Sequence, residues 1–176
     1  MPNSSATARR ISVASGVTLE APLVSHGADI QRLVAACPPL DVNSTYLYLL
    51  LCEHFSATCV RAVRDGRTQG FVSAYCPPGR ADVVFVWQVA VAAQMRGQGL
   101  AQNMLLSLLS RDALRHCRYL ETTVSPSNVP SMAVFHTLAQ RLEAPVSESP
   151  LFLETHFGKE AHESETLIRI GPFEAA

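Results

Sequence analysis

The segment with the clearest chemical potential is Gln94-Met95-Arg96-Gly97-Gln98-Gly99-Leu100-Ala101. It joins a long apolar run to a stretch with helical periodicity, so its backbone N–H groups stand at the N-terminus of an expected helix. The partial positive charge there favours an anion, and glycine lets the main chain approach a phosphate closely. The segment therefore predicts a phosphate-bearing ligand, although two glycines also suit an ordinary strand-to-helix connection.

Two common phosphate-binding motifs do not match this segment. A dinucleotide-binding turn needs a third glycine at position 102, where the chain has Gln102. A nucleoside-triphosphate loop needs Gly-Lys-Ser/Thr, and the only lysine of the chain is the distant Lys159. Both motifs are excluded by residue type.

Four further residues could bind a polar substrate, and each has a structural alternative. Asp41 and Tyr46 lie around the start of an expected helix, where Asp41 suits a loop acid or a cap and Tyr46 suits the core. Trp87 could be a core aromatic packed within a strand, or its ring face could bind an ammonium group of the substrate through a cation–π contact. Glu121 lies within an expected strand, where burial requires water, a substrate amine or a cation such as Arg118.

Periodicity and turn residues predict the elements that position these residues. Strands are expected at 19–23, 58–64, 70–75, 83–91, 119–124, 151–157 and 166–170, and helices at 28–36, 45–55, after Gly99 and at 128–140. Asp65-Gly66 favours a tight antiparallel hairpin, and Asn43 and Ser44 suit the N-cap of the second helix. That helix is apolar nearly all round, as expected for one packed on several sides or used in a subunit contact.

The run Val83–Val91 is rich in β-branched and aromatic residues without alternation, which predicts a central strand covered on both faces. After the glycine turn, apolar residues recur at helical spacing. These are Ala101, Met104, Leu105, Leu108 and Leu109. The chain is therefore predicted to be α/β (α+β), with a mixed central sheet of six to seven strands and helices on both faces.

Composition limits the domain organisation and the class of partner. A chain of 176 residues with 48% hydrophobic residues favours one domain, expected over 17–176 after a disordered leader at 1–16. A net charge of -1 argues against a nucleic-acid partner, and no apolar run is long enough for a membrane span or signal peptide. We expect a cytoplasmic protein without membrane or nucleic-acid partners.

Neither a metal site nor a disulfide framework is expected. His156, His162 and Glu163 lack the spacing of a helical HExxH site, which favours surface or pocket-lining roles. The five cysteines are odd in number, lack CxxC spacing and lie mostly in apolar runs. Reduced and mostly buried thiols follow from that pattern.

The glycine segment resembles the acetyl-CoA pyrophosphate loop of the GNAT acetyltransferases, whose pattern Gln/Arg-x-x-Gly-x-Gly/Ala is met by Gln94, Gly97 and Gly99. The resemblance implies acetyl-CoA as co-substrate and a central strand that splays from its neighbour. Asn128 matches an asparagine that contacts the cofactor, but Phe135 stands where the family has a tyrosine that protonates the departing thiolate. The implied cofactor-binding residues are Val89, Val91, Arg96, Gly97, Gln98, Gly99, Leu100, Ala101 and Asn128.

Longer blocks between residues 38 and 173 narrow this resemblance. They resemble the L-2,4-diaminobutyrate acetyltransferase family, whose members make N4-acetyl-diaminobutyrate on the route to the compatible solute ectoine. The blocks include PPLDVNSTYLYLLLCEHF, FVWQVAV, LETTVSPSN and RIGPF. The resemblance implies a homodimer and a small diamine substrate, mostly cationic at neutral pH. It favours Asp41, Tyr46, Trp87 and Glu121 as the substrate-binding residues.

The implied reaction is direct transfer, in which the neutral 4-amine attacks the thioester and coenzyme A leaves as thiolate. Glu121, directly or through water, is the expected general base, and the backbone N–H of Val89 is expected to meet the oxyanion. Candidates for the substrate carboxylate are His156, His162 or a backbone nest. The rival functions are a GNAT acetyltransferase for another small amine or polyamine, and a non-catalytic acyl-CoA-binding module.

Overall fold

The computed structural model describes residues 16–159 and 162–174, and within them seven strands form one sheet in the order β1-β2-β3-β4-β5-β7-β6. The strands are β1 (Thr18–Glu20), β2 (Val60–Arg64), β3 (Arg67–Tyr75), β4 (Val83–Val91), β5 (Tyr119–Val124), β6 (Val146–Phe152) and β7 (Glu165–Ile170). The α-helices are α1 (Gly27–Ala35), α2 (Thr45–His54), α3 (Leu100–Leu109) and α4 (Val129–Arg141). Only β4 and β5 pair in parallel, which confirms the predicted mixed sheet.

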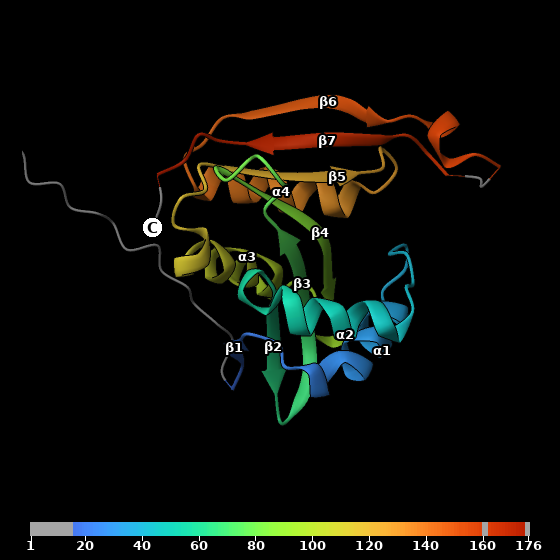
Figure 1. Cartoon of the computed structure of the whole chain (residues 1–176), viewed down its shortest axis with the longest axis vertical. Helices are drawn as coiled ribbons and strands as arrows, with labels where there is room; N and C mark the ends of the chain where they lie inside the picture. Colours follow the sequence, from blue (N-terminus) through green and yellow to red (C-terminus); the bar gives the residue numbers. More distant parts are fainter. Residues whose placement is uncertain (1–15, 160–161, 175–176) are drawn as a thin grey trace, which may run out of the picture.

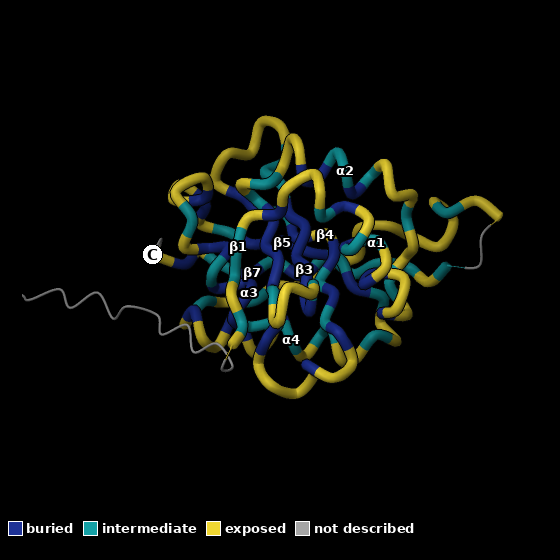
Figure 2. The backbone as a smooth tube through the Cα atoms, turned by 90° about the horizontal axis from the view of Figure 1, so that it is seen from below, coloured by how far each residue is buried: buried dark blue, intermediate teal, exposed yellow. Residues whose placement is uncertain are grey.

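Helices cover both faces of the sheet, as two neighbouring residues of β3 show. A Cβ at Gly70 would meet the Met104 side chain of α3 at 2.7 Å, whereas the Phe71 ring meets Tyr48 of α2 edge-on. Because successive strand residues point to opposite faces, α2 and α3 lie on opposite sides. The buried core follows the central strands (Figure 2), and β5, β7 and β6 run across the direction of β2 and β3 (Figure 1).

Local sequence signals explain several of these elements. The hairpin between β2 and β3 turns at Asp65 (φ 52°) and Gly66 (φ 72°), the left-handed pair that such a turn requires. Four of the five apolar residues expected on the inner face of α3 are buried, and Ala101 is partly covered. In α2, Tyr48, Leu51 and Cys52 are buried, whereas its other leucines are only partly covered.

The central strand β4 departs from its expected burial. Residues 84, 86, 88 and 90 are buried, whereas Phe85, Trp87, Val89 and Val91 are partly or largely open. The prediction of a strand covered on both faces is therefore wrong. The reason is that every second residue of β4 faces a cavity instead of a helix.

The two parallel strands separate partway along their length. Pairing of β4 with β5 runs from Val83↔Tyr119 to Val86↔Thr122, although β4 continues to Val91 and stays paired with β3. The β3–β4 register also shifts, so that Trp87 has no partner opposite it. The splay expected from the family resemblance is confirmed, and it opens the sheet on the β5 side of Val89.

Some predicted boundaries differ from the structure. The strand expected at 151–157 is instead β6, which ends at Phe152 and is followed by a 3-10 turn at Glu154–Phe157. This edge strand is exposed and shows little alternation of apolar and polar residues, so the sequence pattern did not predict where it begins and ends. The strand expected at 19–23 is reduced to Thr18–Glu20. Apart from Gly16, the predicted leader lies outside the described residues, and four of the five cysteines are buried.

Candidate active site

The turn before α3 presents free main-chain donors to a cavity. Gly97 and Gly99 have φ values of 72° and 75°, and Gly99 is the N-cap of α3 with no side chain capping the first turn. A Cβ at either glycine would meet nothing within 4 Å. The first turn of a helix has N–H groups without helical partners, so this turn is suited to bind an anion.

A cavity of about 510 Å³, here called the glycine-loop cavity, lies against this turn. Gln102 lines this cavity, and its Oε1 is buried with no hydrogen-bond partner in the described part of the chain. The Gln102 amide donates to the Val134 carbonyl of α4 at 2.6 Å. A long ligand that carries phosphate groups suits the main-chain donors of the glycine turn. Of the predicted cofactor-binding residues, Val89, Val91, Arg96, Gly97, Gly99, Leu100, Ala101 and Asn128 line this cavity.

A second cavity of about 870 Å³, here called the acidic cavity, lies beside the first. Its ionisable lining combines four carboxylates, one arginine and one histidine: Asp41, Glu121, Glu163, Glu165, Arg80 and His162. Val89, Asn128 and Phe135 line both cavities, so the two spaces meet where β4 has separated from β5. An anionic ligand in one cavity and a cation in the other would meet at Val89.

The predicted site residues are only partly brought together. Asp41, Trp87 and Glu121 line the acidic cavity, and the Trp87 side chain is 41% exposed rather than packed in the core. Tyr46 is 67% exposed and lines neither cavity, so its expected place in the helix core is wrong. Tyr48, two residues further on, is the buried tyrosine of α2. Gln98 is exposed and lies outside both cavities.

Glu121 is held by two guanidinium groups that the sequence did not identify. Its side chain is 3% exposed, and it accepts from both terminal nitrogens of Arg80, at 2.9 and 2.5 Å, and from Arg169 at 2.5 Å. Burial acts to raise the pKa of Glu121, but the hydrogen bonds from the two arginines outweigh it and lower the pKa below its usual value. Arg118, which the sequence offered as one alternative partner, instead donates to the Phe173 carbonyl. The alternative of a structural ion pair is correct in kind, but its cations are Arg80 and Arg169.

The loop that carries Asp41 is fixed by a buried glutamine of β4. The Gln88 amide donates to the Asp41 carbonyl at 2.9 Å, and Gln88 Oε1 accepts from the Tyr48 hydroxyl at 3.2 Å. The Gln88 N–H donates to the Ser73 hydroxyl oxygen. Gln88 is therefore a positioning residue, which the sequence pattern concealed within an apolar strand.

Residues at the junction of the cavities have defined partners. Asn128 caps α4 by accepting from the Ser131 N–H at 3.3 Å, which leaves its amide donors for a ligand. Phe135 is buried there and brings no hydroxyl. The Val91 carbonyl accepts from Arg96 Nε at 3.1 Å and from the Cys37 thiol at 3.4 Å. A pantetheine amide that bonded to this carbonyl would compete with Arg96.

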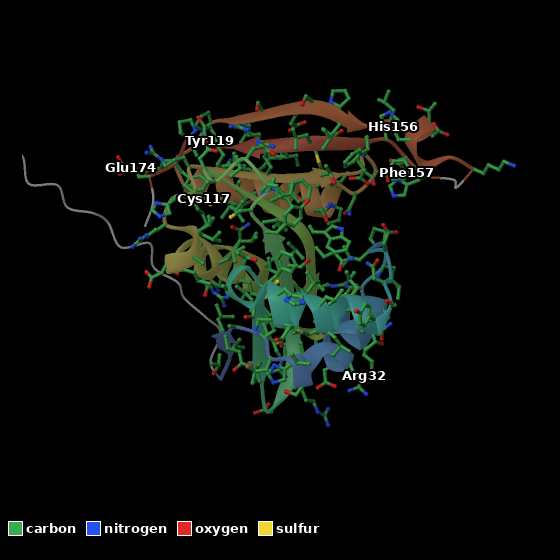
Figure 3. The ribbon with its side chains drawn as sticks, in the orientation of Figure 1. Arg32, Cys117, Tyr119, His156, Phe157 and Glu174 are labelled. Carbon is green, nitrogen blue, oxygen red and sulfur yellow. The ribbon has the colours of Figure 1, made fainter. Side chains whose placement is uncertain are left out.

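The histidines near the C-terminus have different positions. The His162 ring stacks on Phe157 at 3.9 Å between centroids and lines the acidic cavity, next to Glu163. His156 lies outside that cavity and accepts from the Leu153 N–H. Phe157 marks the end of the β5–β7 layer opposite to Tyr119 (Figure 3). Among the described residues, no cluster of His, Cys, Asp and Glu could hold a metal ion.

The sequence model described as the acetyltransferase (GNAT) family matches residues 28–139. An L-2,4-diaminobutyric acid acetyltransferase of Bordetella parapertussis is 53% identical over 156 residues, which cover 88% of this chain and 84% of that protein. The chain is a GNAT acetyltransferase of the diaminobutyrate family. A family member from Marinococcus halophilus is 45% identical, with 89% and 91% of the two chains covered.

The diaminobutyrate family is also represented by a solved structure with the same fold. Diaminobutyrate acetyltransferase EctA from Paenibacillus lautus, in complex with L-2,4-diaminobutyric acid and coenzyme A, has a TM-score of 0.88 at 37% identity. The match covers 91% of this chain and 97% of that one. Within residues 16–159 and 162–174, no helix is both long and apolar enough to span a membrane.

Proposed function

We propose that this enzyme transfers the acetyl group of acetyl-CoA to the 4-amine of L-2,4-diaminobutyrate, on the route to ectoine. The observation that carries the proposal is the junction at Val89 between an anion-binding glycine turn and a carboxylate-lined cavity. The glycine turn is suited to the pyrophosphate, and the carboxylates are suited to the ammonium groups. The membership of the diaminobutyrate family supports the same substrate.

The proposed chemistry is direct attack of the neutral amine on the thioester carbonyl. The Val89 N–H is the proposed donor to the oxyanion because Val89 stands where the two cavities meet. Phe135 cannot protonate the departing thiolate, so that proton comes from solvent or from another side chain. Trp87 and Asp41 are proposed to bind the cationic substrate, Trp87 through its ring face. Tyr46 lines neither cavity, so its hydroxyl could contact the substrate only from outside them.

Glu121 was predicted both to bind substrate and to act as the base. Two arginines and a lowered pKa make Glu121 a weak proton acceptor, and they keep it ionised, the form that can bind an ammonium group. Substrate binding therefore has the stronger support. A Glu121→Gln variant tests the base role: an alkaline shift or collapse of the pH profile of kcat supports it. An unchanged pH profile of kcat together with a raised KM for the diamine would leave Glu121 with a role in substrate binding only.

The deciding experiment is product analysis with acetyl-CoA and L-2,4-diaminobutyrate. Mass spectrometry should detect one added acetyl group, and NMR should place the new amide at N4. Polyamines and other small diamines supplied in parallel test the rival substrate. Coenzyme A binding without any acetylated product would favour the non-catalytic module.

We also propose a cytoplasmic homodimer. Val42 and Tyr46 expose apolar surface around the start of α2, whose leucines are only partly covered by their own chain. The free thiols suit a reducing compartment. Light scattering should give twice the chain mass of 19.1 kDa, and a mass of one chain would contradict the dimer.

A further inference from the structure

The acidic cavity contains a single permanent positive charge. Among the described residues, Arg80 is the only arginine or lysine that lines it, against four carboxylates. The carboxylates suit the ammonium groups of any diamine, whereas a guanidinium is matched only by a ligand that also carries an anionic group. A diamino acid carries one carboxylate, and it needs one cation in its site. The charges of the cavity therefore match a diamino acid better than a plain diamine.

Glu121 is bonded to two guanidinium groups that are held differently. Arg169 lies on β7 directly opposite Glu121, and its guanidinium stacks on the Tyr119 ring at 3.9 Å from the centroid. Arg80 instead reaches Glu121 from the loop between β3 and β4, with a side chain that is 44% exposed. Arg169 is thus the fixed partner, and Arg80 is the partner that can turn away without leaving Glu121 unpaired.

We propose that Arg80 binds the α-carboxylate of the substrate while Glu121 binds the ammonium group on the same carbon. The two charges of an amino-acid head group would then replace the direct Arg80–Glu121 contact, and Arg169 would keep its bond to Glu121. A guanidinium recognises a carboxylate with two parallel hydrogen bonds, the geometry that Arg80 already makes with Glu121. This inference rests on the proposed function and identifies its carboxylate-binding residue.

The same placement selects between the two amines of the substrate. Glu121 is opposite Phe85 in the sheet, and Val89 lies four residues further along β4. A head group held at Arg80 and Glu121 keeps its 2-amine protonated on a carboxylate and directs the side chain towards Val89. Only the 4-amine then reaches the junction of the cavities.

The test compares L-2,4-diaminobutyrate with 1,3-diaminopropane, which lacks only the carboxylate. For Arg80→Gln, we expect the preference in kcat/KM for the amino acid to fall about 10- to 100-fold, the loss of a charged hydrogen-bonded contact. Arg80→Lys should restore part of it, and NMR should detect N2-acetyl product from Arg80→Gln. Arg67→Gln, on the exposed β2–β3 hairpin, controls for the lost charge.

An unchanged ratio between the two diamines would overturn the proposal, because a purely structural Arg80 affects both substrates equally. Calorimetric titration of wild type and Arg80→Gln with each diamine makes the same comparison without turnover. If the wild type acetylates neither diamine, the proposed function fails. The titration then tests the role of Arg80 without turnover. If Arg80→Gln weakens the binding of both diamines equally, or of neither, the proposal for Arg80 is overturned.

Discussion

Replacing Glu121 by glutamine should destabilise the fold in a pH-dependent manner. The substitution keeps the shape of the side chain and leaves Arg80 and Arg169 facing each other without a carboxylate. Removing one partner of a buried ion pair costs about 3–5 kcal/mol, and because Arg80 can turn to water we expect about 2 kcal/mol here. For a chain of this size, that loss lowers Tm by about 4–8 °C at neutral pH.

The pH dependence follows from the lowered pKa of Glu121 in the folded state. A carboxylate with a depressed folded pKa contributes stability that is complete above its unfolded pKa of about 4.3 and is lost as pH falls through the folded pKa. Thermal unfolding of wild type and Glu121→Gln between neutral and acid pH should therefore give curves that converge on acidification. Glu53→Gln, on the exposed face of α2, is the matched control and should leave Tm unchanged.

Equal Tm values at neutral pH would refute the argument that the ion pair contributes net stability. A difference that widened on acidification would refute the direction of the pKa shift.

Three further substitutions test other parts of the site. Gly99→Ala forces a side chain into a left-handed residue at a cost of about 1–2 kcal/mol and places a methyl group over the turn, so KM for acetyl-CoA should rise severalfold in steady-state kinetics. Gly66→Ala, with a similar φ in the distant hairpin, should lose stability and keep that KM; equal KM effects would contradict the assignment. Trp87→Ala should raise KM for the diamine about tenfold through loss of a cation–π contact, and an unaltered KM would return Trp87 to a structural role. Tyr48→Phe removes the hydroxyl bonded to Gln88, so thermal unfolding should report a loss of about 1 kcal/mol, and an unchanged Tm would show that the bond adds nothing.

Signals that act over a few residues were sufficient to predict most elements. Asp65-Gly66 specified a hairpin because its backbone conformation is local, and the helix expected at 128–140 corresponds to α4 (Val129–Arg141). The glycine turn indicated an anion site because the donors belong to one helix end. The bounds of the edge strand β6 were predicted wrongly because this strand buries almost nothing and carries no apolar period.

The sequence by itself determined the order of strands and helices, the glycine turn and the identities of three acidic-cavity residues, Asp41, Trp87 and Glu121. Only the tertiary structure decided which cations meet Glu121. Arg80 is 41 residues away in the chain and Arg169 is 48, and they converge there through the register of β5 with β7 and the loop before β4. The tertiary structure also decided that Tyr46 is exposed and that Tyr48 is buried. The physical reason is that side-chain partners and burial depend on which segments pack together, whereas turn and helix signals depend on neighbours along the chain.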